Sequence, residues 1–123
     1  MTDDEIRFIT KGYFTKRELA CKCGICDSEC DMDKHFLERL LVFRVLLDMP
    51  VLVNSGFRCD KHALQSANHG SGKAVDIECD NSRYRFKVIK AAIIAGFRRI
   101  GIGETFIHLD DNPVGDQEVV WLY

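Results

Sequence analysis

The stretch His69-Gly70-Ser71-Gly72-Lys73-Ala74-Val75-Asp76-Ile77-Glu78-Cys79 decides the fold of this chain. From residue 73 to residue 79 the side chains alternate in a way that predicts a strand with two different sides. One side would carry Ala74, Asp76 and Glu78, and the other Val75, Ile77 and Cys79. Two glycines just before this strand predict a loop over residues 68–73. The strand therefore holds a carboxylate on its more polar side, shortly after a histidine.

Helices are predicted before this strand. Thr15, followed three residues later by Glu18 and preceded by an apolar residue, has the form of a capping box, which predicts a short helix over 15–20. Apolar residues recur at three- and four-residue steps over 33–48, so a second helix is expected there, ended by Pro50. Its buried face is predicted to consist of Phe36, Leu37, Leu40, Leu41, Phe43, Leu46 and Leu47. Residues 51–54 form a short predicted strand, and residues 62–66 a brief helix.

The second half of the sequence adds one helix and three strands. Asn81 or Ser82 is expected to cap a helix that reaches Ala95, with Gly96 as its stop. Its buried stripe is predicted to be Phe86, Ile89, Ile93 and Ile94. Strands are expected over 99–102, 105–110 and 119–123. This order of elements predicts an α+β domain in which helices pack on a mainly antiparallel sheet.

Length and composition limit the possible classes of protein. A chain of 123 residues fits one domain, which we assign to residues 1–123. A net charge of −2 and a pI of about 6.1 give no general basic surface, so nucleic acid is not expected as a partner. The longest apolar stretches fall short of the ~20 residues of a membrane span, so no membrane partner is expected either. We expect a monomer.

The first residues bear on where the protein works. The sequence opens with Met1-Thr2-Asp3-Asp4-Glu5, which is acidic where a secretory signal would be basic. We therefore expect no signal peptide. The protein would be made in the cytoplasm and would reach a target outside it only after release by another agent.

Six cysteines without a signal argue against a secreted disulfide scaffold. Cys21, Cys23, Cys26 and Cys30 lie within ten residues, close enough to share a metal ion. Zinc sites with four thiolates usually draw two ligands from each of two separated turns, whereas all four crowd into one segment here. Reduced thiols, or a bridge to Cys59, are the alternatives. A redox role for the Cys23–Cys26 pair lacks the strand-then-helix context of such motifs.

Two imidazoles and one carboxylate, from His69, Asp76 and His108, make a recurrent set of ligands for catalytic zinc. Three protein ligands leave the fourth position of the ion for water, and bound zinc lowers the pKa of that water to ~7. A glycine-containing loop allows His69 to fold back over the strand that carries Asp76. His108 would approach from a neighbouring strand on the same face of the sheet.

The order of three motifs resembles a known family. The segment His69-x-x-Gly72-x-Ala74-x-Asp76, followed by Phe106-Ile107-His108-x-Asp110, is similar to that of the zinc D-alanyl-D-alanine carboxypeptidases. The preceding Ser55-Gly56-Phe57-Arg58 resembles the family's segment ahead of the first ligand, and Trp121 fits its terminal strand. The likeness runs from about Phe14 to Trp121. Members share the fold of the hedgehog signalling domain and cleave peptidoglycan peptides, and many are lysis enzymes of phages.

This resemblance implies roles for individual residues. His69, Asp76 and His108 would bind Zn²⁺, and Arg58 would polarise the scissile carbonyl or hold a substrate carboxylate. The implied substrate is a stem peptide of peptidoglycan, cut by a D-Ala-D-Ala carboxypeptidase or an L-Ala-D-Glu-type endopeptidase. Glu104 is the preferred general base, and Asp110 is its rival or else a group that orients a ligand.

The sequence departs from the family at two informative positions. Relatives commonly have an acidic residue three positions before the last histidine, where this chain has Thr105. They often have serine two residues before the first ligand, where Ala67 stands here. The first departure motivates an alternative function, a non-catalytic, zinc-containing module that binds the cell wall. The second leaves recognition of a terminal D-Ala-D-Ala open.

Overall fold

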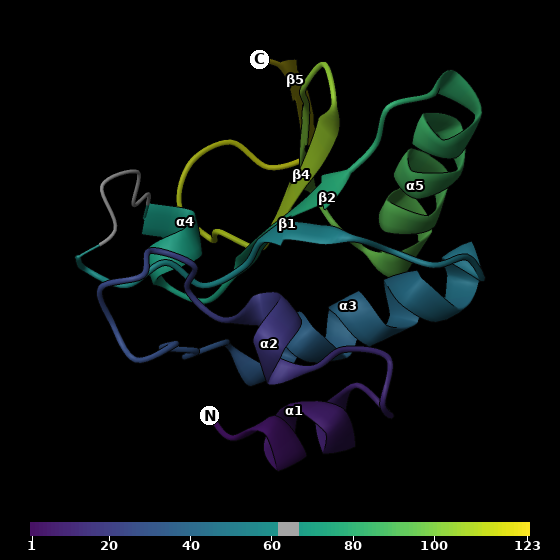
Figure 1. Ribbon diagram of the computed structural model, residues 1–123. Coiled ribbons are helices and arrows are strands. Elements are labelled where there is room, and N and C mark those ends of the chain that lie inside the picture. Colours follow the sequence, from purple (N-terminus) through teal and green to yellow (C-terminus); the bar gives the residue numbers. More distant parts are fainter. Residues whose placement is uncertain (62–66) are drawn as a thin grey trace.

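Five short strands form one mixed sheet in the computed structural model, which describes residues 1–61 and 67–123 (Figure 1). The strands are β1 (Val53–Ser55), β2 (Ala74–Glu78), β3 (Arg99–Ile102), β4 (Phe106–Asp110) and β5 (Val119–Leu122). Their order in the sheet is β1-β2-β4-β3-β5, and all neighbours are antiparallel except β3 and β5. The predicted α+β class with a mainly antiparallel sheet is confirmed.

The described residues also form five helices, α1 (Asp3–Ile9), α2 (Lys16–Leu19), α3 (Lys34–Leu47), α4 (Ala67–Gly70) and α5 (Ser82–Ala95). Thr15 and Glu18 form the expected capping box at the start of α2, and the Asp33 carboxylate accepts a hydrogen bond from the N–H of Phe36 at the start of α3. Gly96 ends α5 in the left-handed conformation, as predicted. Within the described residues, no helix has the length and hydrophobicity required to cross a bilayer.

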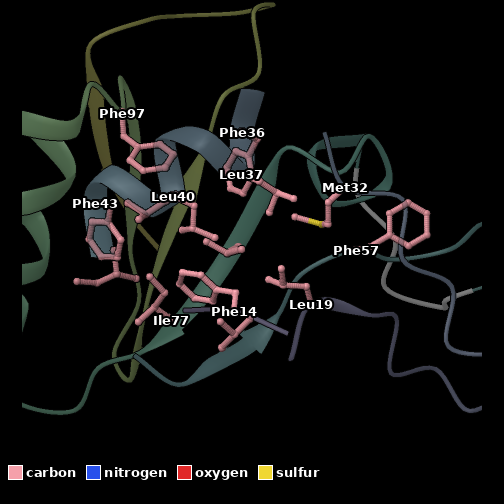
Figure 2. Close-up of a cluster of buried hydrophobic side chains, with 14 of the residues drawn as sticks. Phe14, Leu19, Met32, Phe36, Leu37, Leu40, Phe43, Phe57, Ile77 and Phe97 are labelled. Atoms are coloured by element: carbon pink, nitrogen blue, oxygen red, sulfur yellow. The ribbon is translucent and has the colours of Figure 1, made fainter. Parts of the chain in front are cut away.

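The two faces of the sheet differ as the alternation along β2 predicted. One face carries Val75, Ile77, Ile100, Ile107 and Leu109, all buried, and packs against the helices. Figure 2 shows Ile77 close to Phe14, Leu40 and Phe43 in this core. Hydrophobic burial on this side fixes which residues point to the other side, because side chains alternate along a strand. The other face is thereby left to carry Asp76 and His108.

The predicted buried face of α5 is wrong except at Ile89, which is partly buried against the core. Phe86, Ile93 and Ile94 are largely exposed, and the buried residues are Val88, Ala91 and Ala92. Alanines on the inner side let α5 lie close to α3, and Phe97 just beyond the helix supplies the bulk that contacts Phe36 and Phe43. The larger side chains had suggested the opposite face. In α3, Leu46 is likewise exposed, although Phe36, Leu37, Leu40, Phe43 and Leu47 are buried as predicted.

Two further elements differ from the prediction. The first residues form α1, started by a second capping box between Thr2 and Glu5 that was not recognised behind the acidic run. The region expected to be loop over 68–73 begins with α4, a single helical turn. One turn has too few residues to show a hydrophobic period, so contacts distant in sequence decide its conformation. The helix predicted over 62–66 lies outside the described residues.

A matched pair of substitutions tests which residues of β4 and α5 face the core. Ile107→Ala removes a fully buried side chain from the core face of β4 and should lower the free energy of unfolding by about 2–5 kcal/mol. Ile94→Ala alters a largely exposed residue of α5 and should change it by less than about 0.5 kcal/mol. Urea denaturation followed by circular dichroism measures both. Equal losses would contradict the described packing of α5.

Candidate functional site

The sheet register brings one row of residues together on the open face. Asp76 of β2 lies opposite His108 of β4, His108 lies opposite Gly101 of β3, and Gly101 lies beside Trp121 of β5. Directly opposed residues point to the same face of a sheet. Asp76 and His108 therefore share a face, and the Asp76 carboxylate lies 2.9 Å from Nδ1 of His108.

His69 reaches the same point from α4. Its Nε2 lies 3.4 Å from the second carboxylate oxygen of Asp76, and its ring centroid lies 5.3 Å from that of His108. The chain returns to β2 through Gly72, whose φ of +74° suits glycine. A Cβ at Gly72 would lie 2.1 Å from the carbonyl oxygen of Asp31, so no larger residue fits this close approach. The glycine that the motif requires thus lets the histidine fold back over the strand.

The outer nitrogen of each imidazole has a partner that fixes the tautomer. Nδ1 of His69 lies 2.7 Å from the carbonyl oxygen of Gly56, and Nε2 of His108 lies 2.7 Å from the Asp110 carboxylate. Both partners are acceptors, so these two nitrogens carry the protons. When a metal ion replaces the proton on the inner nitrogens, the lone pairs of His69 Nε2 and His108 Nδ1 would point to that ion beside Asp76, as in the histidine ligands of zinc sites.

These three side chains fit a divalent metal ion. Their ligand atoms all lie within 4.8 Å of one another, and His69 and His108 are almost fully buried. Ligand atoms around tetrahedral zinc, with bonds of about 2.1 Å, lie roughly 3.4 Å apart. The 3.4 Å and 2.9 Å contacts of the Asp76 carboxylate are close to that spacing. The site thus offers the donor set that the sequence predicted for zinc.

The pKa shifts of Asp76 and His108 also indicate a site for a cation. Burial raises the pKa of Asp76, but hydrogen bonds from His108 and His69 outweigh it and hold this pKa well below its usual range. Burial lowers the pKa of His108, yet the carboxylates of Asp110 and Asp76 raise it overall. A proton between His108 and Asp76 therefore stabilises the metal-free arrangement. A bound cation would replace that proton, so metal binding should release protons.

Asp110 lies behind His108 and is completely buried. One carboxylate oxygen accepts hydrogen bonds from His108 Nε2 and from the Asn68 amide, and the other from Arg99 Nε and the N–H of Asn112. Four donors fill the acceptor positions of a carboxylate. The side chain thus has the geometry of a group that orients a metal ligand, which was one of the two roles predicted for it.

Arg58 is adjacent to the Asp76 carboxylate. Its Nη2 lies 3.5 Å from an oxygen of Asp76, and its Nε donates to the hydroxyl of Ser55 in β1. The backbone N–H of Arg58 donates to the carbonyl of His69. The guanidinium is thus held beside the three candidate ligands, the position that the resemblance to the peptidase family implies for it.

Glu104, the preferred general base, lies outside this group of side chains. It is exposed in the turn between β3 and β4, four residues before His108. Glu78 is also exposed but lies only two residues from Asp76, on the same face. No measurement tests the assignment of a base to Glu104 or Asp110, and it stays a prediction.

Aromatic side chains border the site, and the sequence singled out only one of them. Trp121 lies with its ring centroid 5.6 Å from that of His108, and the rings of Tyr123 and Phe106 lie 5.0 Å apart beside it. Gly101 leaves space for the ring of Tyr123, because a Cβ at this position would lie 2.6 Å from that ring. The alternation of β4 and β5 could have indicated that Phe106 and Tyr123 share the face of His108.

An α+β domain that gathers two imidazoles and a carboxylate on the open face of its sheet defines a candidate metal-dependent enzyme. A family model described as Peptidase M15 matches residues 12–110, and the chain belongs to this family. It is thus a metallopeptidase by family, and M15 peptidases are zinc enzymes. The resemblance to the zinc D-Ala-D-Ala carboxypeptidases holds at the level of this family. Searches of curated proteins and of solved structures found no match.

The partner of His108 generates a prediction about metal affinity. Asp110→Asn should weaken zinc binding at this site about 10–100-fold, because an amide holds the histidine tautomer less firmly. Asp111→Asn is the control, since Asp111 pairs with Arg39 and has no direct contact with the three ligands. Competition with a chelator of known affinity measures both variants, with circular dichroism to show that they are folded. Equal zinc affinities would contradict the orienting role.

Proposed function

We propose that this chain hydrolyses an amide bond in the stem peptides of bacterial peptidoglycan, as a zinc-dependent carboxypeptidase or endopeptidase. The observation that carries the proposal is the convergence of His69 Nε2, Asp76 and His108 Nδ1, with both imidazoles held in the tautomer that a metal needs. Family membership supports peptidase chemistry. The choice of peptidoglycan, and a role in phage lysis after release from the cytoplasm, rest on the resemblance of the motifs.

Zinc held by these ligands would polarise the scissile carbonyl and activate water at neutral pH. The chain's own residues supply the rest. Arg58 places a positive charge next to Asp76, where it would stabilise the negative charge that develops on the carbonyl oxygen. Asp110 keeps His108 in position through Nε2. The side chains of Trp121 and Tyr123 offer an apolar border on which a short peptide with small alanine side chains would rest.

Proton transfer requires a carboxylate that reaches both water and the leaving amine. Asp110 is buried and its oxygens are occupied, and Glu104 is exposed in the turn before β4, four residues from His108. Glu78 is two residues, about 7 Å, from Asp76 and is open to solvent. The geometry therefore favours Glu78 as the group that moves the proton.

The central prediction concerns His108. His108→Ala should remove zinc from this site and abolish cleavage, because the ion loses one of three protein ligands. Digestion of purified peptidoglycan, followed by labelling of new amino groups and mass spectrometry of the products, measures the loss and identifies the bond cut. His35→Ala, at a strongly exposed position of α3, is the control and should cleave like the wild type. Full cleavage by zinc-free His108→Ala protein would refute the proposal.

The same assay separates the enzyme from its main alternative. A non-catalytic module would sediment with the cell wall and release no new amino groups, whereas a peptidase releases them in proportion to time. The alternative is favoured by one observation: Thr105 stands where relatives carry an acidic residue.

Two conservative substitutions test the proton carrier. Glu78→Gln should lower kcat about 10²–10⁴-fold, the usual contribution of general acid–base catalysis, while zinc content stays unchanged. Glu104→Gln should retain nearly full activity, since Glu104 is exposed in the turn and not on the strand face that carries the ligands. Steady-state kinetics on a defined stem peptide, with zinc analysis, checks both. The reverse result would restore Glu104 as the base.

A further inference from the structure

Four cysteine sulfurs from two separated segments meet next to the candidate active site. Cys21, Cys23 and Cys26 belong to the loop after α2, and Cys59 follows β1. Their sulfur atoms all lie within 4.8 Å of one another, with Cys23 Sγ 3.5 Å from Cys26 Sγ and 3.6 Å from Cys59 Sγ. Cys30, which the spacing in the sequence had grouped with the first three, is not a member of this cluster.

The backbone around these four residues points hydrogen-bond donors at the sulfurs. The N–H groups of Ile25 and Cys26 donate to Cys23 Sγ, and the N–H of Cys59 donates to Cys21 Sγ. Gly24, at a φ of +77°, forms the tight turn between Cys23 and Cys26. Such N–H donors stabilise thiolates and orient them toward a shared metal ion.

Cys21, Cys23, Cys26 and Cys30 all lie in one segment, which is unusual for a zinc site with four thiolates. Cys59 removes that objection, because the four ligands now come from two separated turns, as in structural zinc sites. Sulfur atoms bound to one tetrahedral zinc at about 2.3 Å lie roughly 3.8 Å apart, and the 3.5 Å and 3.6 Å separations are near this value. We infer that Cys21, Cys23, Cys26 and Cys59 bind a second, structural zinc ion through four thiolates.

This ion would fasten the cysteine loop to the segment that supports the catalytic centre. Cys59 directly follows Arg58, and the carbonyl of Gly56, three residues earlier, holds Nδ1 of His69. The same segment is tied to the end of α2, where the N–H of Phe57 donates to the carbonyl of Leu19. A Cβ at Gly56 would lie 2.6 Å from that carbonyl oxygen. The structural zinc thus completes the support behind His69 and Arg58, an effect that rests on the proposed function, whereas the binding itself does not.

Zinc analysis of the whole chain tests the inference. Protein purified under reducing conditions without added metal should carry about two zinc ions per chain, one for each group of ligands. Cys59→Ser and Cys23→Ser should each lose one ion and keep the one at His69, Asp76 and His108. Cys79→Ser is the matched control, because Cys79 is a buried thiol outside the cluster, and it should retain both ions. Unchanged zinc content in Cys59→Ser and Cys23→Ser would overturn the inference.

The design separates this inference from the proposed function. His108→Ala should lose the zinc ion of the candidate active site and keep the thiolate-bound ion. A variant that loses one ion therefore shows which of the two sites was disrupted. In addition, release of the catalytic zinc to a chelator should be faster in Cys59→Ser than in Cys79→Ser, because the Gly56 carbonyl is then less firmly placed. Equal rates of zinc release in the two variants would contradict the supporting role of the thiolate site, but not the binding of the second ion.

A second measurement on the unaltered protein covers the case in which a cysteine variant does not fold. Cobalt(II) bound to the chain should give the intense sulfur-to-metal charge-transfer absorption of a tetrathiolate site, and His108→Ala should retain it. Denatured, unreduced protein should react at all six cysteines with a thiol reagent once the metal is chelated. Fewer reactive thiols, together with no sulfur-to-cobalt absorption, would show a disulfide instead and overturn the inference.

Discussion

The pairing of β2 with β4, which sets Asp76 opposite His108, is the constraint on which the site depends. Side chains alternate along both strands, so a shift of one residue would turn one ligand into the core and bring an apolar residue to the open face. Val75, Ile77, Ile107 and Leu109 prevent that shift, because exposing them would cost several kcal/mol. The hydrophobic core therefore specifies the metal site, although it contains none of the ligands.

Electrostatic pairing then fixes the side chains that the register has brought together. Burial of a carboxylate is unfavourable unless it is paired or hydrogen-bonded. Asp110 is fully buried and meets this requirement through Arg99, His108 and two neutral donors, so its charge is compensated on all sides. Asp76 is instead left with Arg58 and the inner nitrogens of the two imidazoles. Of these two acids, Asp76 is the one whose surroundings still favour a cation.

The fold and the ligand set could be predicted from sequence because both depend on local patterns. Alternation defined β2, the spacing of apolar residues located α3, and capping residues located α2 and α5, each within a few residues. The buried side of α5 was not predictable in this way, because close packing on α3 selects the small Ala91 and Ala92 over larger apolar neighbours. For a similar reason the sequence indicated Cys59 only as a possible disulfide partner and not as a metal ligand. Its partners lie more than thirty residues away, and no local period relates residues that meet only through the tertiary fold.

The segments around the site explain why a small domain would need ties beyond its core. The loop after α2, residues 56–59 and the turn before β2 supply the cysteines, Arg58 and His69, yet they belong to no long helix and to no central strand. Among the contacts that hold them are the close approach of Gly72 to Asp31 and the hydrogen bond from the N–H of Phe57 to Leu19. Each such contact contributes only about 1 kcal/mol. A closed metal site joins two of these segments with far more binding free energy than hydrogen bonds provide. The segments on the open face of the sheet would thereby be held as firmly as the core face is held by hydrophobic packing.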